Sequence, residues 1–437
     1  MERTMINRKQ RLINVLLSFL IISIMVACTP FTERTSGPVR ITMWTIAVEA
    51  DATHNAFANA VQKYNETHRD VQIDISYIPD ASYKTQLEVA IGAGDIPDIF
   101  QTWGGGTLKD QIDAGVVQEI QSFSKETFDK FRSITLGPST FGGKHYAVPV
   151  DLVFAFFWYN KDLFDQFKIQ VPTTWSEFLS TCKTFKNAGI VPVAVGNKER
   201  WPGGFFTDYL INRIGGQEAF DNATYNQANG GSFTDPTFIQ AWAKIKEATE
   251  TGCFEEGVNA TDSSDAGLLV ATGKAAMQLQ GNWMLFYFRD VDEDFANNRL
   301  GIFPFPSIEG GAGNPADLMG GTGQAMAISS SAPPEAESAL IEMLGSEQFA
   351  QDLAYAGLIP AAASFDKKFF ANDPVMNKIL EMASTAPTLH LFYGTDLPPQ
   401  LADAYWNVTQ KVFGLATTPE EAADEMQSAA KVRNLNN

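Results

Sequence analysis

Cysteine is scarce in this chain of 437 residues, which contains only Cys28, Cys182 and Cys253. Three cysteines cannot build the cross-linked framework of a small disulfide-rich domain, so that class of protein is excluded. Cys28 closes an N-terminal hydrophobic run. Cys182 and Cys253 could pair in an oxidising compartment, but two buried free thiols are also compatible with the sequence, so their pairing stays open.

The sequence motifs of catalysis and metal binding are missing. His-Glu-x-x-His, Cys-x-x-Cys and Gly-x-Ser-x-Gly do not occur, and the phosphate-loop and dinucleotide fingerprints are incomplete. The acidic run 290–294 has Phe295 where a calcium loop requires glycine. The sequence therefore predicts no metal site, no cofactor and no enzymatic activity. A glycoside hydrolase stays open as an alternative, because it needs only two carboxylates that the fold brings together.

Basic residues are also in the minority. The chain has 32 Lys and Arg against 51 Asp and Glu, which gives a formal net charge of −19. So acidic a surface repels the phosphate backbone of DNA or RNA, and we expect no nucleic-acid partner.

The N-terminus combines positive charge with the hydrophobic run. Basic residues within 3–11 precede the apolar segment 12–27, which is short for a membrane span of roughly 20 residues. The segment ends in Met25–Cys28, which resembles the lipobox of bacterial lipoproteins. We expect residues 1–27 to be a lipoprotein signal peptide, Cys28 to be lipidated and 28–38 to be a tether. The alternative is an uncleaved anchor helix. Both place the folded part outside the cytoplasm, at the cell surface or in the periplasm.

The remaining ~400 residues exceed what one hydrophobic core usually holds, which favours two domains. In the first half, apolar residues alternate over 39–43 and 71–77, and a short apolar run covers 98–100. Helical periodicity separates these three segments. The alternation of strands and helices predicts a parallel α/β sheet with right-handed crossovers.

A second α/β unit begins with Val153–Tyr159, an apolar run typical of a strand that is covered on both faces. Thr174 and Glu177 form a capping-box pattern that predicts a helix start. Further segments predict strands at 191–195 and 275–280 and helices that begin near residues 235, 334, 346 and 418. The last third of the chain is therefore expected to be mostly helical.

An ordered set of motifs resembles the extracellular solute-binding protein family 1, which includes the maltose- and oligosaccharide-binding proteins. The strand end and helix start in Trp158–Phe164 and Val171–Phe178 are the most specific part. The other members of the set are Gly94–Asp98, Gly273–Met277, Gly281–Trp283, Phe303–Pro306 and Gly320–Gly321. The resemblance covers essentially the whole chain after the tether.

The resemblance implies a two-lobed fold of the periplasmic-binding-protein type II class, in which each hinged lobe has a central sheet flanked by helices. It implies lobe 1 at 39–150 plus 300–329 and lobe 2 at 151–299 plus 330–437. Hinges are expected near Pro149–Phe154, Leu300–Phe303 and Ala325–Ser331. The implied partners are a sugar or short oligosaccharide and the membrane permease subunits of an ABC importer, with the protein acting as a monomer on its lipid anchor.

Aromatic and polar residues follow several predicted strands, which is where open α/β sheets bind ligands. Aromatic planes stack on the apolar faces of a pyranose, while carboxylates, amides and bare backbone contact its hydroxyl rim. The candidate sugar contacts are Trp44, Gln101, Trp103, Asp151, Glu199, Trp201, Trp283, Gly321 and Thr322.

Burial in the core is the competing interpretation for each tryptophan. Trp158, Trp175 and Trp242 lie inside strand or helix patterns and are assigned to the core, whereas Trp406 is left undecided. Two other functions compete with sugar binding. A binder of a different solute would need clustered Tyr and His ligands for iron, or an acid-rich aromatic box for a polyamine. The other is the extracellular hydrolase.

Overall fold

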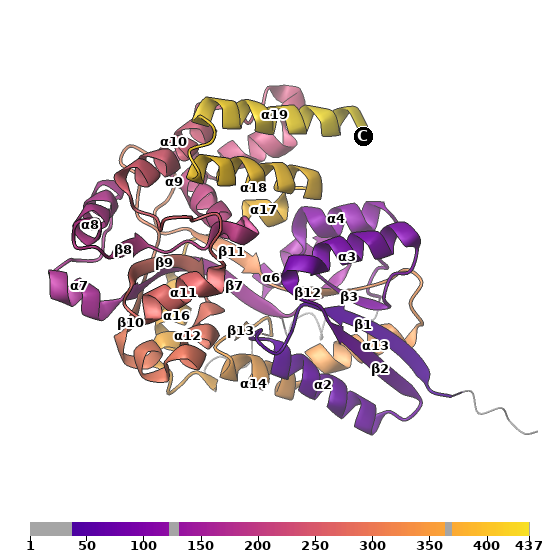
Figure 1. Cartoon of the computed structure of the whole chain (residues 1–437). Coiled ribbons are helices and arrows are strands. Elements are labelled where there is room, and N and C mark those ends of the chain that lie inside the picture. Colours follow the sequence, from indigo (N-terminus) through magenta and orange to yellow (C-terminus); the bar gives the residue numbers. More distant parts are fainter. Residues whose placement is uncertain (1–36, 122–130, 363–368, 437) are drawn as a thin grey trace, which may run out of the picture. The chain divides into compact units, whose positions relative to one another are not determined.

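The computed structural model describes residues 37–121, 131–362 and 369–436. The expected signal peptide, Cys28 and nearly all of the tether lie outside the described residues. Two main sheets organise the described chain, and helices cover each of them (Figure 1). We call the first sheet with its helices lobe 1 and the second sheet with its helices lobe 2.

Lobe 1 has a five-stranded sheet in the order β2-β1-β3-β12-β6. Its strands are β1 (Val39–Thr45), β2 (Val71–Tyr77), β3 (Ile99–Thr102), β6 (Ala147–Pro149) and β12 (Ala325–Ile328). β1 and β3 are parallel, as predicted, but β12 runs antiparallel to both β3 and β6. The helices are α2 (His54–Thr67), α3 (Asp80–Ala93), α4 (Gly105–Asp113), α6 (Ser133–Leu136), α13 (Glu335–Leu344) and α14 (Glu347–Tyr355), with η1 (Gly137–Ser139) and the hairpin β4 (Thr140–Phe141) and β5 (Lys144–His145).

Lobe 2 is built around β7 (Asp151–Asn160), which pairs with several other strands. The others are β8 (Val191–Val193), β9 (Ala275–Gly281), β10 (Leu300–Phe303), β11 (Leu318–Thr322), β13 (Ile359–Pro360) and β14 (Leu389–His390). The helices are α7 (Lys161–Phe167), α8 (Trp175–Asn187), α9 (Trp201–Tyr225), α10 (Pro236–Thr251), α11 (Ser263–Ala271), α12 (Met284–Val291), α16 (Pro374–Thr385), α17 (Tyr393–Asp396), α18 (Pro399–Phe413) and α19 (Pro419–Asn436). The short 3-10 helices η2 (Asn197–Glu199) and η3 (Gln227–Asn229) and the π-helix η4 (Phe295–Arg299) complete the lobe.

The apolar run of β7 is buried on both faces, which explains why it does not alternate. Phe154, Phe156 and Trp158 belong to one core cluster, whereas Val153 and Phe157 belong to the other. Two layers of helices therefore pack on opposite faces of a single strand.

Local sequence signals set several helix starts. Glu177 N donates to Thr174 Oγ1 and Thr174 N donates to Glu177 Oε2, so the predicted capping box is present. Asp235 Oδ1 accepts from Thr237 N at the start of α10, with Pro236 in the first turn. These caps confirm the predicted starts of both helices.

The chain crosses between the lobes at Val150, between β11 and β12, and between α14 and β13. The first crossing coincides with one expected hinge, but two expected boundaries need correction. Leu300–Phe303 pairs antiparallel with β7 and therefore belongs to lobe 2. Ala325–Ser331 is not itself the second crossing, because β12 lies inside the lobe 1 sheet and the crossing precedes it.

The assignment of all residues after 330 to lobe 2 also needs correction. Helices α13 and α14 pack on α2, and Phe349 of α14 meets Phe57 with ring centroids 5.3 Å apart. The apolar faces of these two helices are therefore buried in lobe 1, and lobe 2 resumes only at β13.

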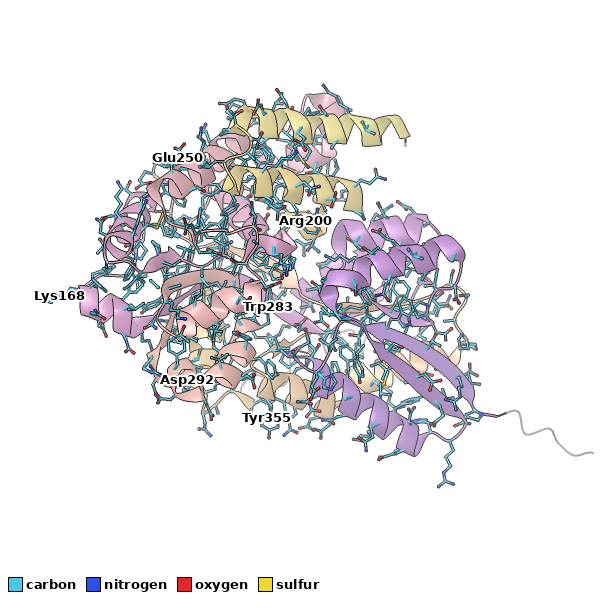
Figure 2. All side chains as sticks on the ribbon, viewed as in Figure 1. Lys168, Arg200, Glu250, Trp283, Asp292 and Tyr355 are labelled. Carbon is cyan, nitrogen blue, oxygen red and sulfur yellow. A yellow bond between two sulfur atoms is a disulfide. The ribbon has the colours of Figure 1, made fainter. Side chains whose placement is uncertain are left out.

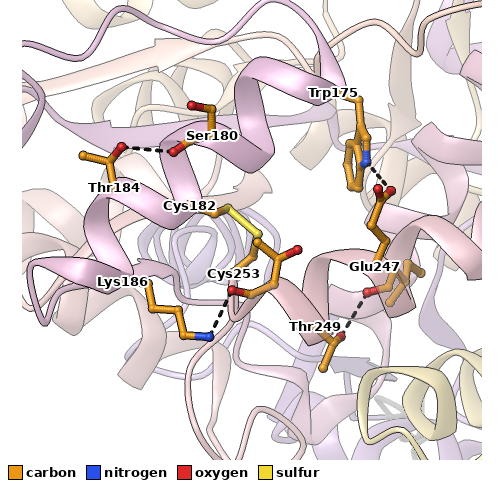
Figure 3. The surroundings of a disulfide bond; sticks show 10 residues. Trp175, Ser180, Cys182, Thr184, Lys186, Glu247, Thr249 and Cys253 are labelled. Carbon is orange, nitrogen blue, oxygen red and sulfur yellow. Dashed lines mark hydrogen bonds between the residues drawn. A yellow bond between two sulfur atoms is a disulfide. The ribbon is translucent and has the colours of Figure 1, made fainter.

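Cys182 of α8 and Cys253, just after α10, form a disulfide (Figure 3), which settles the pairing that the sequence left open. The bond ties α8 to the segment that leaves α10. Val193 N donates to Cys253 O, so the same segment is also bonded to β8.

Trp158, Trp175 and Trp242 are buried, as predicted. The Trp175 ring packs on Phe178, and its Nε1 donates to Glu247 Oε2 at 3.0 Å (Figure 3). Trp175 is thus both an apolar and a hydrogen-bonded part of the lobe 2 core.

Replacing Trp175 by alanine should lower the free energy of unfolding by about 3–5 kcal/mol, because the truncation leaves a cavity in the core and removes the hydrogen bond from the indole to Glu247. Denaturant unfolding followed by circular dichroism measures this loss. Tyr355→Ala removes an aromatic ring that is 75% exposed and serves as the control with little expected effect. Equal midpoints for the two variants would contradict a core role for Trp175.

Candidate functional site

A cavity of about 420 Å³ is lined by residues of both lobes. Its walls come mainly from the segments that follow strands, at residues 46–53, 103–107, 199–208 and 283–287. In α/β proteins these positions commonly form ligand sites, and the volume lies in the range of small-molecule pockets. This cavity is therefore the candidate binding site.

One wall of the cavity is aromatic and belongs to lobe 2. Trp201, Phe205, Trp283 and Phe392 form what we call the aromatic wall. The ring centroids of Trp201 and Trp283 are 6.1 Å apart, and those of Phe205 and Phe392 are 4.4 Å apart. Figure 2 labels two residues that locate the aromatic wall: Trp283, which lies just after β9, and Arg200, which lies just before α9 and directly precedes Trp201.

The Gly281–Trp283 motif has a local structural cause. The Trp283 ring folds back over Gly281 so closely that a Cβ there would lie 2.0 Å from it. Asn282 holds the turn against β7, because its Oδ1 accepts from Phe154 N and its Nδ2 donates to Leu152 O. The motif therefore anchors Trp283 to β7 while the ring faces the cavity.

Lobe 1 contributes a cation held between two rings. Lys84 Nζ of α3 lies 4.6 Å from the Trp103 ring centroid and 4.9 Å from that of Trp406 on α18. Both distances are typical of cation–π contacts. Desolvation lowers the pKa of Lys84, although its side chain keeps contact with solvent. The contact joins a lobe 1 side chain to a lobe 2 ring.

Acidic side chains complete the lining. Burial raises the pKa of Asp151 to about 7, and its Oδ1 accepts from Gln324 N at 2.9 Å. Burial also raises the pKa of Glu199 to about 7 and that of Asp208 to about 8. Near neutral pH these groups exchange protons easily, so they can present either a hydrogen-bond donor or an acceptor to a ligand.

Six of the residues predicted to contact a ligand line this cavity: Trp103, Asp151, Glu199, Trp201, Trp283 and Thr322. They come from β7, from β11 and from the segments after β3, β8 and β9. The fold thus brings together positions that are more than 200 residues apart in the sequence.

The other three predicted contacts, Trp44, Gln101 and Gly321, are not among the lining residues, and the structure gives them different surroundings. Trp44 packs against the lobe 1 core because its side chain leaves β1 toward a helix-covered face. Gln101 is fully buried in β3, where Oε1 accepts from Thr45 Oγ1 and from Ile46 N. Gly321 is a buried β11 residue that pairs with Val153.

Sequence reasoning missed Lys84, Phe205, Asp208, Phe392 and Trp406, which all line the cavity. Trp406 was undecided because its helix pattern resembles that of a buried ring. Lys84 gave no signal, because a lysine on a helix is usually a solvated surface residue. Gly204 and Gly394 were the available hint for Trp406, since a Cβ at either position would lie within 3.2 Å of its ring.

The sequence family follows from a match to the model of the bacterial extracellular solute-binding proteins over residues 50–350. The chain belongs to this family. Its members act outside the cytoplasm, and the family consists of solute-binding proteins rather than enzymes.

Individual relatives agree with this membership. A probable sugar-binding periplasmic protein of Mesorhizobium japonicum is 26% identical over 79% of this chain and 82% of its own length. The melibiose/raffinose/stachyose-binding protein MelE of Bacillus subtilis is 22% identical over 94% of both chains. A solved structure from work on xylan utilization by Caldanaerobius polysaccharolyticus is 28% identical, with a TM-score of 0.82 over 89% of this chain and 99% of the other.

The solute-binding protein thus has the two-lobed α/β fold of its structural relatives, as predicted. Within residues 37–121, 131–362 and 369–436, no helix is long and apolar enough to cross a membrane. The same part of the chain contains no group of three or more His, Cys, Asp or Glu side chains that could hold a metal ion.

The raised pKa of Asp208 predicts how stability depends on pH. The folded protein holds this proton more tightly than the unfolded chain, so stability should fall as pH rises from about 4 to about 8. Asp208→Asn removes the titrating group and should flatten the slope of the melting temperature across this window. Calorimetric melts at several pH values measure the slope. The exposed Asp95→Asn is the matched control, and equal slopes for both variants would contradict the assignment.

Proposed function

We propose that this solute-binding protein captures a sugar or short oligosaccharide in the cavity and delivers it to the membrane permease of an ABC importer. The observation that carries the proposal is that the aromatic wall and carboxyl groups with raised pKa values line the same cavity. A pyranose has apolar C–H faces and a polar rim, so it can use both surfaces at once.

Unpaired polar groups add support. Trp201 Nε1 and Gln324 Oε1 are buried at the cavity and have no hydrogen-bond partner among the described residues. A buried polar atom without a partner costs free energy, and a ligand hydroxyl can supply the missing bond. We propose Trp103, Asp151, Glu199, Trp201, Trp283 and Thr322 as ligand contacts, with Trp406 and Phe205 as additional ring surfaces.

The relatives point to the same class of solute. One is named for sugar binding, one for melibiose, raffinose and stachyose, and one comes from work on xylan utilization. Raffinose and xylotriose, a xylan-derived trisaccharide, are therefore suitable first probes. We propose that the protein works as a monomer and releases its sugar unchanged, since a transport receptor must hand over an intact solute.

A cationic solute such as a polyamine is the second candidate. It is favoured by the five acidic side chains of the lining, Asp51, Asp80, Asp151, Glu199 and Asp208. Against it, burial raises the pKa of Asp51, Asp151, Glu199 and Asp208, so the lining carries less negative charge than its composition suggests. Lys84 also lines the cavity, and its positive charge opposes a cationic ligand.

Trp283→Ala should weaken sugar binding by roughly thirtyfold or more, which corresponds to about 2 kcal/mol for a desolvated aromatic anchor. Titration calorimetry with raffinose and xylotriose measures the affinity, and mass spectrometry of the recovered sugar checks that it is intact. Trp175→Ala is the control, because it should lower stability but keep the affinity of the folded protein.

Normal affinity in Trp283→Ala together with a much lower melting temperature would place Trp283 in the core and contradict this site. Binding of spermidine in place of either sugar would favour the cationic solute. A cleaved sugar would favour the hydrolase.

We also propose that the protein is anchored by a lipid on Cys28, after removal of residues 1–27. The basic residues, short apolar run and lipobox-like Met25–Cys28 support this. Cys28→Ser should abolish incorporation of a fatty-acid analogue during metabolic labelling and leave the protein either soluble or as the uncleaved precursor. Cys182→Ser is the control that should still be labelled. Continued labelling of the Cys28→Ser protein would contradict the anchor.

A further inference from the structure

We propose that Glu255 is a positioning residue for the binding site: its buried carboxyl group holds the segment 194–201, the site loop, so that Trp201 and Glu199 face the cavity. The inference deepens the proposed function, on which its affinity measurement rests. Glu255 itself is not among the residues that line the cavity.

The carboxyl group of Glu255 binds two consecutive backbone amides. Oε2 accepts from Val195 N at 2.9 Å and Oε1 accepts from Gly196 N at 2.8 Å. β8 ends at Val193, and the last amide beyond it that reaches β9 is that of Ala194, which donates to Met277 O. Where the sheet partner ends, Glu255 therefore takes over the amides that would otherwise be buried without acceptors.

The segment 253–263, the support loop, lies directly under the site loop. Asn197 N donates to Val258 O at 2.9 Å, and Lys198 N donates to Thr261 O at 3.1 Å. Gly196 has φ +66°, and a Cβ at this position would lie 2.6 Å from Asp262 O. The two loops approach so closely that only a glycine with this left-handed conformation fits between them.

The support loop is itself fixed to the core. Cys253, two residues before Glu255, is bonded to Cys182 of α8. The loop also pairs with β8, because Val193 N donates to Cys253 O and Phe254 bridges to Val193. A covalent and hydrogen-bonded path therefore runs from α8 through the disulfide to Glu255 and the site loop.

The far end of the site loop is constrained as well. Arg200 has φ +69°, an unusual conformation for a residue with a side chain, and its guanidinium donates to Asp403 Oδ1 and Asn407 Oδ1 on α18. Trp201 follows at once and packs on Phe205 and Trp283. With Arg200 holding one end and Glu255 the other, the Trp201 ring has a fixed position in the aromatic wall.

Glu255 is an acid in the protein interior. The residue is 7% exposed, and burial raises the pKa of its carboxyl group. Placing an acid in the interior costs free energy, which the two amide bonds offset. The conformation of the site loop therefore depends on the hydrogen bonds of this one side chain and not only on apolar packing.

The test compares Glu255→Gln with Glu247→Gln. Both changes replace a hydrogen-bonded lobe 2 carboxyl group by an amide, but Glu247 bonds the core residue Trp175 and not the site loop. Glu255→Gln turns an –NH2 group toward one backbone N–H, so it should lower the affinity for raffinose or xylotriose about tenfold at a temperature where the protein is fully folded. Glu247→Gln should keep the affinity.

A double-mutant cycle separates positioning from general destabilisation. If Glu255 acts through the site loop and Trp201, Glu255→Gln should cost much less affinity in a Trp201→Ala background than in the parent. Fully additive losses would overturn the proposal, as would an unchanged affinity in the single variant.

Hydrogen exchange of the amides in 194–203 gives a reading that needs no ligand. Exchange there should accelerate in Glu255→Gln and not in Glu247→Gln. If the parent binds neither sugar but this difference in exchange is found, the result counts against the proposed ligand. It still supports the proposal that Glu255 holds the site loop. Equal exchange rates in both variants would overturn the proposal that Glu255 holds the site loop.

Discussion

Strand β7 pairs with β9, β10, β11 and β13 and is buried on both faces, so most of lobe 2 depends on its hydrogen bonds and side chains. The same strand begins with Asp151, one residue after the chain leaves lobe 1, and Asp151 lines the cavity. Asn282 fixes Trp283 by bonding the backbone of this strand. Asp151 and Trp283 are therefore both held in place by the backbone of a strand that is packed in the core.

The rest of the site is built by segments that have left a sheet and need other partners. After β8, the backbone amide of Gly196 donates to the carboxyl group of Glu255. After β3, the chain turns at Gly104, whose φ is +73°. After β1, Ile46 N donates to the side chain of Gln101. In each case a buried side chain or a glycine fixes a loop near the cavity. Residues remote from a ligand can thus set the accuracy of the site, since a small displacement of a loop moves the ring that it carries.

Local patterns were sufficient to predict the strands β1, β2, β3, β7, β8 and β9 and the capped helix starts, because alternation, buried runs and caps act within a few residues. Lobe boundaries were harder. Leu300–Phe303 is a strand of lobe 2 only through pairing with a segment about 140 residues earlier, which no local pattern reveals. For the candidate site, position after a strand pointed to Trp103, Trp201 and Trp283, which line the cavity. Trp44 packs against the lobe 1 core and does not line the cavity, because which face a side chain meets depends on the helices packed there.

Charge in the cavity depends on burial rather than on composition. The surroundings raise the pKa of Asp151 and Asp208 toward neutrality, so neither behaves like a surface carboxylate. Asp208 is held by Tyr405 Oη at 2.7 Å, which keeps it at the cavity despite the cost of its burial. A hydroxyl that donates to such a carboxyl group stabilises its ionised form and so lowers its pKa. A hydroxyl that instead accepts from the protonated acid favours the protonated form, so the pH dependence of the affinity reports which of the two roles the ligand takes at these acids.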